Sequence, residues 1–140
     1  MSLKSIVLDA NILIRSVLGE AVRNIIIQYH EKIDFFVPDV CLMDAVKYIP
    51  QIFEKRNMPS KPAMALLEKL KTLFNIVDKE IYMQYSHDAK ERMKARDIND
   101  WPIVATALTF SCPIWTEDKD FFGSGMPTWT TDRIHIFLQQ

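Results

Sequence analysis

Short apolar runs alternate along the chain with longer segments in which apolar residues recur every three or four positions. Short runs are typical of buried strands, and the longer spacing is typical of amphipathic helices. The pattern predicts strands at residues 4–8, 35–37, 76–77 and 114–116. It predicts helices at residues 11–18, 20–32, 39–55, 63–74, 79–96 and 100–110, and a short terminal helix after Thr128-Trp129.

Prolines mark two interruptions in this pattern. Pro50 lies inside the helix predicted at residues 39–55, so we expect that helix to be kinked or split there. Residues 57–62 contain two prolines and predict a loop. Strands separated by helices imply right-handed crossovers and a mainly parallel sheet. We therefore expect a single α/β domain over residues 1–140.

Composition limits the possible functions. The 140 residues are 49% hydrophobic and 25% charged, which is typical of a globular domain with a substantial core. Three glycines are too few for a glycine-rich phosphate loop, and the formal net charge of −1 favours no particular ligand. Cys41 and Cys112 lack metal-type spacing, and no apolar run is long enough to cross a membrane. We therefore expect reduced thiols in a cytoplasmic protein.

Two carboxylates follow predicted strands that are far apart in the sequence. Asp9 comes directly after the strand at residues 4–8. Asp118 lies two residues beyond Thr116, the last residue of another predicted strand. Because the carboxyl ends of parallel strands form the ligand crevice of an open sheet, we expect Asp9 and Asp118 to converge.

Two more acids stand in apolar surroundings: Asp100 opens the segment DWPIVATAL, and Asp44 lies within VCLMDAVKYI. Isolated buried carboxylates are costly unless they are paired, protonated or bound to metal. Each acid also has a structural explanation, since Asp100 could cap a helix, Asp118 could form a turn and Asp44 could be solvated. Asp9 is the hardest to explain in this way, because a strand-to-helix junction needs a cap but no adjacent Asn11. Together the four acids indicate a functional site.

Three stretches together resemble the signature sequences of the PIN-domain family, whose members are metal-dependent nucleases. The stretches are IVLDANILIR, which contains Asp9, DWPIVATAL, which begins with Asp100, and PIWTEDKDF, which contains Asp118. Their order and spacing match the family over nearly the whole chain. The resemblance implies a three-layer α/β/α sandwich with a mainly parallel central sheet. The family usually has a glutamate on the helix after the second strand, where this chain offers the shorter Asp44.

The resemblance also implies that these acids hold Mg²⁺ or Mn²⁺. Clustered carboxylates repel one another unless a cation neutralises them or some stay protonated, and oxygen ligands favour these two ions over zinc. We expect Asp9, Asp100 and Asp118 to bind the metal directly, and Asp44 to act through a water molecule. Four further residues are expected to support the site, two by hydrogen bonding and two as neighbouring acids: Asn11, Thr116, Asp97 and Asp120.

The leading hypothesis is a metal-dependent ribonuclease similar to the toxin of a bacterial toxin–antitoxin pair. Its expected partners are RNA, a small antitoxin protein and a second copy of the chain, with no membrane. Basic residues gather at positions 55–61 and 90–96. The second group leads toward the acids, so it is a candidate track for RNA phosphates or else a solvated helix face.

Two alternatives stay open. One is a catalytically weak or inactive PIN-like module that binds RNA or a protein, and Asp44 in place of glutamate favours it. The other is a phosphotransfer receiver domain, which also places aspartates at strand ends. A receiver needs an acidic pair at the first strand, where this chain has Asn11.

Overall fold

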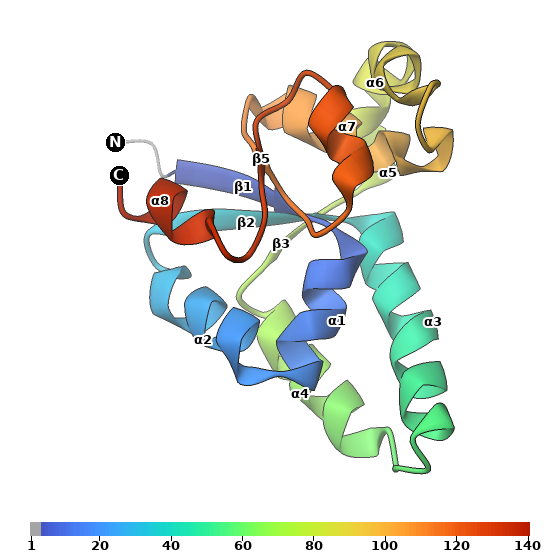
Figure 1. Ribbon diagram of the computed structural model, residues 1–140, viewed down its shortest axis with the longest axis vertical. Coiled ribbons are helices and arrows are strands. Elements are labelled where there is room, and N and C mark those ends of the chain that lie inside the picture. The colour runs from blue at the N-terminus through green and yellow to red at the C-terminus, as the bar shows by residue number, and fades with distance from the viewer. Residues whose placement is uncertain (1–3) are drawn as a thin grey trace.

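Five parallel strands form one sheet in the computed structural model, which describes residues 4–140. The strands are β1 (Lys4–Leu8), β2 (Ile33–Pro38), β3 (Asn75–Val77), β4 (Ile114–Trp115) and β5 (Thr128–Trp129). Their order in the sheet is β3-β2-β1-β4-β5, so β1 is central and strand addition changes direction between β1 and β4 (Figure 1). Open α/β sheets bind ligands at such switch points.

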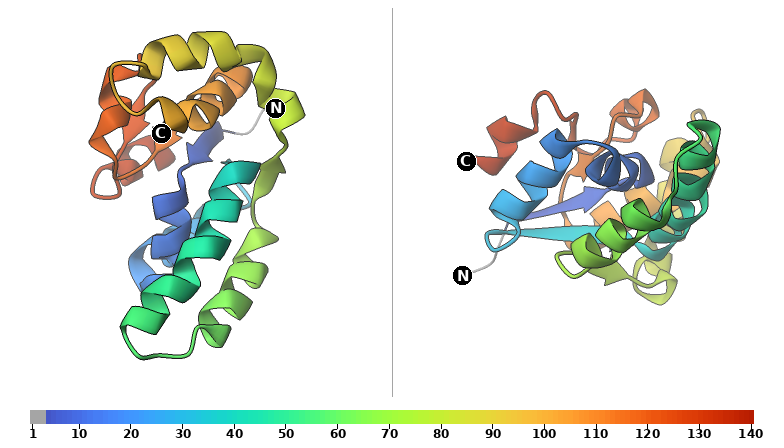
Figure 2. Two further views of the ribbon diagram at one scale, coloured as in Figure 1. Left: turned by 90° about the vertical axis from the view of Figure 1, so that its right-hand side faces the viewer. Right: turned by 90° about the horizontal axis from the view of Figure 1, so that it is seen from below.

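Helices cover both faces of the sheet, which confirms the predicted three-layer α/β/α fold (Figure 1). One layer contains α1 (Ala10–Leu18), α2 (Glu20–Tyr29), α3 (Asp39–Lys55) and α4 (Lys61–Lys71). The other contains α5 (Lys79–Tyr82), α6 (Ser86–Met93) and α7 (Trp101–Phe110). Figure 2 shows α3 and α4 side by side below the sheet and α5 to α7 above it.

The remaining elements are short. Three 3₁₀ helices connect the longer elements: η1 (Met83–Tyr85), η2 (Ile98–Asp100) and η3 (Lys119–Gly123). The terminal helix is α8 (Ile134–Leu138). Lys4 Nζ donates a hydrogen bond to the carbonyl oxygen of Phe137 at 2.8 Å, so α8 lies beside the start of β1.

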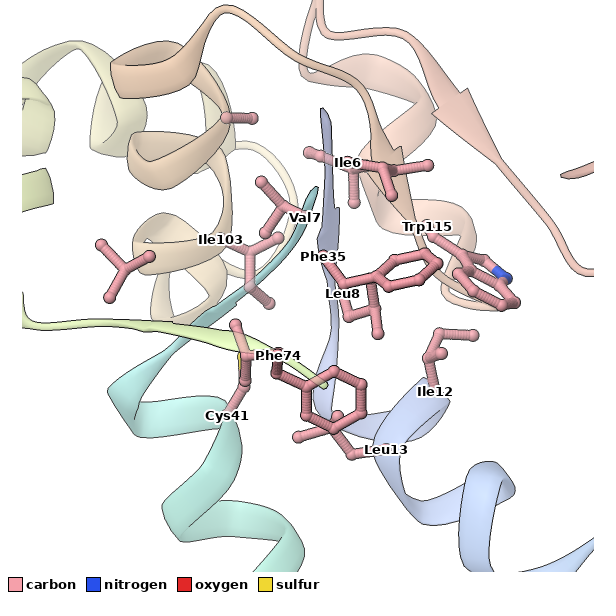
Figure 3. Packing of buried hydrophobic residues seen from close by; sticks show 14 of the residues in the cluster. Ile6, Val7, Leu8, Ile12, Leu13, Phe35, Cys41, Phe74, Ile103 and Trp115 are labelled. Atoms are coloured by element: carbon pink, nitrogen blue, oxygen red, sulfur yellow. The ribbon is translucent and has the colours of Figure 1, made fainter. Parts of the chain in front are cut away.

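The core lies between the sheet and the two helical layers. Ile6, Val7 and Leu8 of β1 are fully buried, because both faces of this strand are covered. A continuous apolar run is expected for such a strand. Phe35 and Trp115 pack beside it with ring centroids 6.3 Å apart (Figure 3). This packing fixes the carboxyl ends of β1 and β4, and therefore the residues that follow them.

The single helix predicted at residues 79–96 is divided into α5, η1 and α6. The division follows Tyr82, whose side chain is fully buried, whereas the residues of η1 are exposed. The Tyr82 hydroxyl donates to Asp39 Oδ1 at 2.7 Å, and its ring meets Trp101 edge-on at 5.6 Å between centroids. These contacts draw the chain inward at one residue, and the tighter 3₁₀ turn accommodates the change of direction.

The sequence predicts a kink or a split at Pro50 and a loop over residues 57–62, and neither the split nor the full length of the loop is present. Pro50 does not split its helix, because α3 continues from Asp39 to Lys55 and buries a stripe of small and apolar residues against the core. Helix α4 begins inside the predicted loop, since Pro62 occupies its first turn, where a missing N–H costs no hydrogen bond. No helix within residues 4–140 is both long enough and apolar enough to span a bilayer. Cys41 and Cys112 are buried free thiols.

Candidate metal centre

The carboxyl ends of β1 and β4 adjoin at one edge of the sheet. The backbone N–H of Asp9 donates to the carbonyl oxygen of Trp115 at 3.2 Å, which continues the β1–β4 pairing beyond the strands. Thr116 in turn donates its N–H to the carbonyl oxygen of Trp129 at 3.0 Å. Asp9 and Thr116, which are 107 positions apart in the sequence, therefore meet at this edge.

Asp9 is the most deeply buried acid at the edge, with 7% of its surface exposed. Its carboxylate accepts hydrogen bonds from the Ala10 N–H at 2.6 Å, Asn11 Nδ2 at 3.0 Å and Thr116 Oγ1 at 2.7 Å. Burial raises the pKa of Asp9 above its usual value, and the hydrogen bond from Thr116 opposes that rise. Asp9 is thus a fixed acid that lies where β1 ends and α1 begins.

Thr116 and Asn11 connect this carboxylate to the segment that follows β4. The Thr116 hydroxyl accepts a hydrogen bond from the Asp118 N–H at 2.9 Å. Asn11 Oδ1 accepts one from the Glu117 N–H at 3.2 Å. The two side chains therefore hold the backbone of residues 117 and 118 against the start of α1.

Three other carboxylates form a compact cluster next to Asp9. Asp100, Asp118 and Asp120 each offer one oxygen atom, and these oxygens lie within 4.8 Å of one another. All three residues are partly buried. Asp118 precedes η3, and its Oδ1 accepts a hydrogen bond from the Asp120 N–H at 3.0 Å, so this turn brings two of the three acids together.

Asp100 is electrostatically unfavourable as a free carboxylate. Burial and then the negative charges of four neighbours raise the pKa of Asp100 from about 3.8 to about 7. The neighbours are Asp9, Asp97, Asp118 and Asp120. Asp100 occupies the N-cap position of α7, yet its side chain makes no capping hydrogen bond. Helix capping therefore does not explain this aspartate, whereas a bound cation would offset the repulsion.

A family profile described as the PIN domain matches residues 7–139, which is nearly all of the chain. The chain belongs to the PIN-domain family. This is a family of nucleases, which sets aside the receiver alternative. A search of curated proteins gives no significant match.

Several solved structures share the fold of this PIN domain. VapBC2 from Rickettsia felis, bound to a DNA fragment from its promoter, is 12% identical with a TM-score of 0.69, covering 90% of this chain and 98% of that chain. PAE2754 from Pyrobaculum aerophilum is 14% identical with a TM-score of 0.71, covering 98% and 90%. A toxin–antitoxin complex from Klebsiella pneumoniae is 22% identical with a TM-score of 0.59, covering 89% and 96%. These TM-scores establish a common fold, and at identities this low the likeness shows the fold alone.

Two predicted acids of this PIN domain lie at the margin of the cluster. Asp44 is exposed on α3, next to the exposed Met43, so its apolar neighbours in the sequence do not indicate burial. Its charge nevertheless raises the pKa of Asp9, which places Asp44 near the same edge. Asp97 is also exposed, and its Oδ1 accepts a local hydrogen bond from the Asn99 N–H at 3.0 Å.

Sequence analysis missed Asp39, which follows β2 at the same edge of the sheet. Its carboxylate accepts hydrogen bonds from the Val40 N–H at 2.8 Å, the Lys79 N–H at 3.1 Å and the Tyr82 hydroxyl at 2.7 Å. Asp39 therefore joins the start of α3 to α5 and supports the fold rather than the cluster. Its position just after a predicted strand could have placed Asp39 at this edge of the sheet, as the same position did for Asp9.

The donor set of this PIN domain suits Mg²⁺ or Mn²⁺. Asp100, Asp118 and Asp120 provide carboxylate oxygens, and within residues 4–140 no histidine or cysteine belongs to their group. Both ions prefer such hard oxygen ligands, whereas zinc sites usually include nitrogen or sulfur. A divalent cation would also reduce the repulsion that raises the pKa of Asp100.

Of the two basic groups, only residues 90–96 adjoin the acids. Lys90 Nζ lies 4.9 Å from the ring centroid of Trp101, the residue directly after Asp100. The group at residues 55–61 begins at the far end of α3, a helix of 17 residues that is about 25 Å long by the standard helical rise. An anion held near the acids would therefore lie closer to residues 90–96 than to residues 55–61.

Proposed function

We propose that this PIN domain is a metal-dependent ribonuclease that hydrolyses phosphodiester bonds of single-stranded or structured RNA. The observation that carries the proposal is the cluster of Asp100, Asp118 and Asp120 beside the buried Asp9. Such a cluster is unfavourable without a cation, and it lies at the crevice where open α/β sheets bind ligands. Membership of a nuclease family supports phosphodiester hydrolysis as the reaction.

In this proposal Mg²⁺ or Mn²⁺ supplies an activated water molecule and offsets negative charge on the phosphodiester. Asp9, Asp100 and Asp118 are the direct ligands, and Asp120 is a further ligand because its oxygen belongs to the compact cluster. Asp44 acts through a water molecule, since it is exposed and shorter than the glutamate that the family usually has there.

Three residues support these ligands. Thr116 and Asn11 hold Asp9 through hydrogen bonds and keep the backbone after β4 in place. Asp97 adds negative charge close to Asp100, which strengthens the attraction for a cation. Such outer contacts orient ligands and commonly change metal affinity when they are removed.

Incubation of the purified protein with short single-stranded RNA, with and without Mn²⁺, tests the proposal. We expect Asp118→Asn to lower the cleavage rate by ~10²-fold or more, because removal of one electrostatic stabiliser has effects of that size. Asp78→Asn is the matched control, since Asp78 is an exposed acid that follows β3, two strands away from β1. It should cleave like wild type. Absence of metal-dependent cleavage by wild type on a broad panel of RNAs would contradict the nuclease proposal.

The alternative is a catalytically weak or inactive module that binds RNA or a protein, and Asp44 is the residue that favours it. If the short side chain limits activity, Asp44→Glu should cleave faster than wild type, whereas Asp44→Asn should have a milder effect than Asp118→Asn. An inactive module would bind Mn²⁺ weakly and would stay inactive after Asp44→Glu. Calorimetric titration with Mn²⁺ distinguishes the two functions.

We also propose a small antitoxin protein as a partner in the cytoplasm. Two of the structural neighbours support this, one a toxin–antitoxin complex and the other VapBC2 bound to promoter DNA. A short reading frame next to the gene, whose product copurifies with this protein and suppresses cleavage, is the expected result. Full activity in the presence of every neighbouring gene product would count against an antitoxin.

A homodimer is proposed from exposed apolar side chains near the start of α3. Met43 of α3 is 67% exposed, Ile81 of α5 is 46% exposed, and Met83, the first residue of η1, is 51% exposed. Asp39, at the start of α3, accepts hydrogen bonds from two residues of α5, so α3 and α5 are in contact. Light scattering should show a dimer that Met43→Asp dissociates. Met58→Asp, at an exposed position beyond the far end of α3, is the control.

A further inference from the structure

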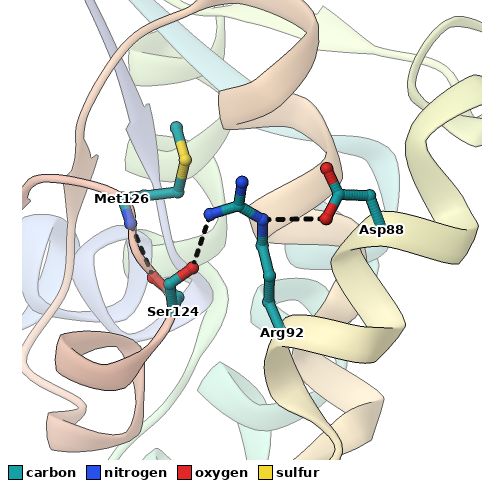
Figure 4. Close-up of polar contacts among 4 residues, drawn as sticks. All are labelled: Asp88, Arg92, Ser124 and Met126. Atoms are coloured by element: carbon teal, nitrogen blue, oxygen red, sulfur yellow. Dashed lines mark hydrogen bonds and ion pairs between the residues drawn. The ribbon is translucent and has the colours of Figure 1, made fainter.

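The guanidinium of Arg92 on α6 bridges two segments of the chain (Figure 4). Its Nε donates to Asp88 Oδ1 at 3.0 Å within α6, and its Nη1 donates to the carbonyl oxygen of Ser124 at 2.8 Å. Ser124 directly follows η3, the short helix that contains Asp120. Arg92 therefore connects α6 to the end of the segment that carries two acids of the cluster.

The loop after η3 is built to receive this guanidinium. Ser124 is 2% exposed, and its hydroxyl donates to the Phe121 carbonyl at 2.7 Å and accepts from the Met126 N–H at 3.2 Å. Gly125 has a φ of +82°, and a Cβ there would lie 2.5 Å from Arg92 Nη1. The loop therefore requires a glycine both for its backbone conformation and for the space that Arg92 occupies.

The same contact joins the two halves of the acidic cluster. Helix α6 leads within a few residues into η2, which ends at Asp100. Asp118 and Asp120 lie at the start of η3, and Ser124 lies at its end. The segment just before η3 is held by Asn11 of α1 and by Thr116, which follows β4. Arg92 is a direct polar link between the segment of Asp100 and the segment of the other two acids.

We propose that Arg92 is a positioning residue that sets the separation between Asp100 and the pair Asp118 and Asp120. The inference rests on the proposed metal-dependent function, because it concerns the geometry in which these acids bind Mn²⁺. A side chain that bonds a backbone carbonyl on one side and a carboxylate on the other fixes both in place, and Arg92 has the planar fork for this. Arg92 adds a polar contact at the end of η3, a helix that the fully buried ring of Phe121 also holds against the core.

Arg92→Gln, Arg92→Lys and Arg96→Gln test the proposal as a set. Arg96 is the matched control: its guanidinium also packs on a glycine of the η3 loop, Gly123, but within residues 4–140 it forms no hydrogen bond or ion pair. Arg92→Gln and Arg96→Gln therefore remove the same charge from the same side of the site. They differ in the loss of the link to Ser124.

Two measurements on each variant separate positioning from general destabilisation. In the metal-free protein, we expect Arg92→Gln to raise amide hydrogen exchange at residues 120–124 about tenfold, whereas exchange in β1 stays unchanged. Calorimetric titration should show Mn²⁺ affinity lowered by about tenfold, the lower end for residues that act through metal ligands. Arg92→Lys should recover part of both effects, and Arg96→Gln should match wild type in both.

If amide hydrogen exchange at residues 120–124 is the same in Arg92→Gln as in Arg96→Gln, the inference is overturned. Raised exchange with unchanged Mn²⁺ affinity would overturn it as well, because the loop would then move without affecting the acids. A wild type that binds no Mn²⁺ would overturn the proposed metal site and this inference together, so the two failures are distinguishable. If Arg92→Gln does not fold, Asp88→Asn takes its place, since it removes only the support within α6 and should give smaller changes in the same direction.

Discussion

The hydroxyl of Thr116 makes three contacts at the sheet edge. It donates to Asp9 at 2.7 Å and accepts from Asn11 Nδ2 at 3.2 Å and the Asp118 N–H at 2.9 Å. Thr116 is fully buried, so water cannot replace these contacts when the hydroxyl is lost. Its side chain therefore affects both the stability of the edge and the geometry of two proposed metal ligands.

Thr116→Val should lower the free energy of unfolding by about 1–3 kcal/mol, because it leaves buried polar groups without a partner. Thr116→Ser keeps the hydroxyl and should cost only about 0.8 kcal/mol for the lost methyl group. Chemical denaturation measures both values. Calorimetry should show weaker Mn²⁺ binding for Thr116→Val and nearly wild-type binding for Thr116→Ser, and equal affinities in the two variants would contradict the role given to the hydroxyl.

Single residues of the site differ in how far the sequence could predict them. Asp9 and Asp118 follow strands, and the parallel arrangement brings strand ends together, so their meeting could be expected. Asp120 was expected only as a neighbouring acid, because its approach to Asp100 depends on the 3₁₀ turn of η3. Asp44 is exposed although its neighbours in the sequence are apolar, because the buried stripe of α3 consists of Cys41, Ala45 and Ile49 and Asp44 lies outside it.

Helix α3 is the element whose sequence conflicts most with its structure. Pro50 lies in its interior, where proline lacks an N–H and its ring crowds the preceding turn. The helix persists because Cys41, Ala45 and Ile49 form a buried stripe along it. Pro62, in contrast, lies in the first turn of α4, where no intrahelical partner exists for an N–H.

Pro50→Ala should therefore stabilise the protein. A proline inside a helix destabilises the folded state by about 3 kcal/mol. Replacing it also gives the unfolded chain more conformational entropy, which stabilises the unfolded state by up to about 1 kcal/mol. We therefore expect the free energy of unfolding to rise by about 2 kcal/mol. Pro62→Ala restores no hydrogen bond and should be neutral or slightly destabilising. Denaturant titration of both variants provides the measurement, and a gain for Pro62→Ala as large as that for Pro50→Ala would show that helix position is not the cause.

Helices and strands could be predicted where the pattern of apolar residues within the element itself indicates its type. The apolar runs of β1 and β2 and the spacing in α1 and α7 depend on burial along a whole element, and these were predicted within a few residues. The division of residues 79–96 depends on Tyr82 reaching Asp39, which no local pattern contains. Strand β5 has two residues, and it exists because Thr116 and Ile114 pair with the segment beside them.

At the scale of the whole molecule, the sheet brings negative charges together, and this links folding to pH. The pKa of Asp100 is about 7 in the folded protein, compared with about 3.8 when the group is free. Between these two values the folded state binds more protons than the unfolded state, so the contribution of Asp100 to metal-free stability is greatest below about pH 3.8, falls as the pH rises, and levels off above about pH 7. The raised pKa of Asp9 acts in the same direction.

A divalent cation should reverse this dependence, because it competes with protons for the same carboxylates. With EDTA, the melting temperature of wild type should fall more from pH 5 to pH 8 than that of Asp100→Asn. The reason is that the variant lacks the carboxylate whose negative charge becomes unfavourable as the pH rises. With millimolar Mg²⁺ or Mn²⁺, wild type should gain melting temperature at pH 8 and gain little at pH 5, where Asp100 is protonated. Asp100→Asn should respond weakly to metal at both values. Parallel metal-free curves for the two proteins would show that Asp100 does not titrate in this range, and a larger metal effect at pH 5 would contradict binding by its carboxylate.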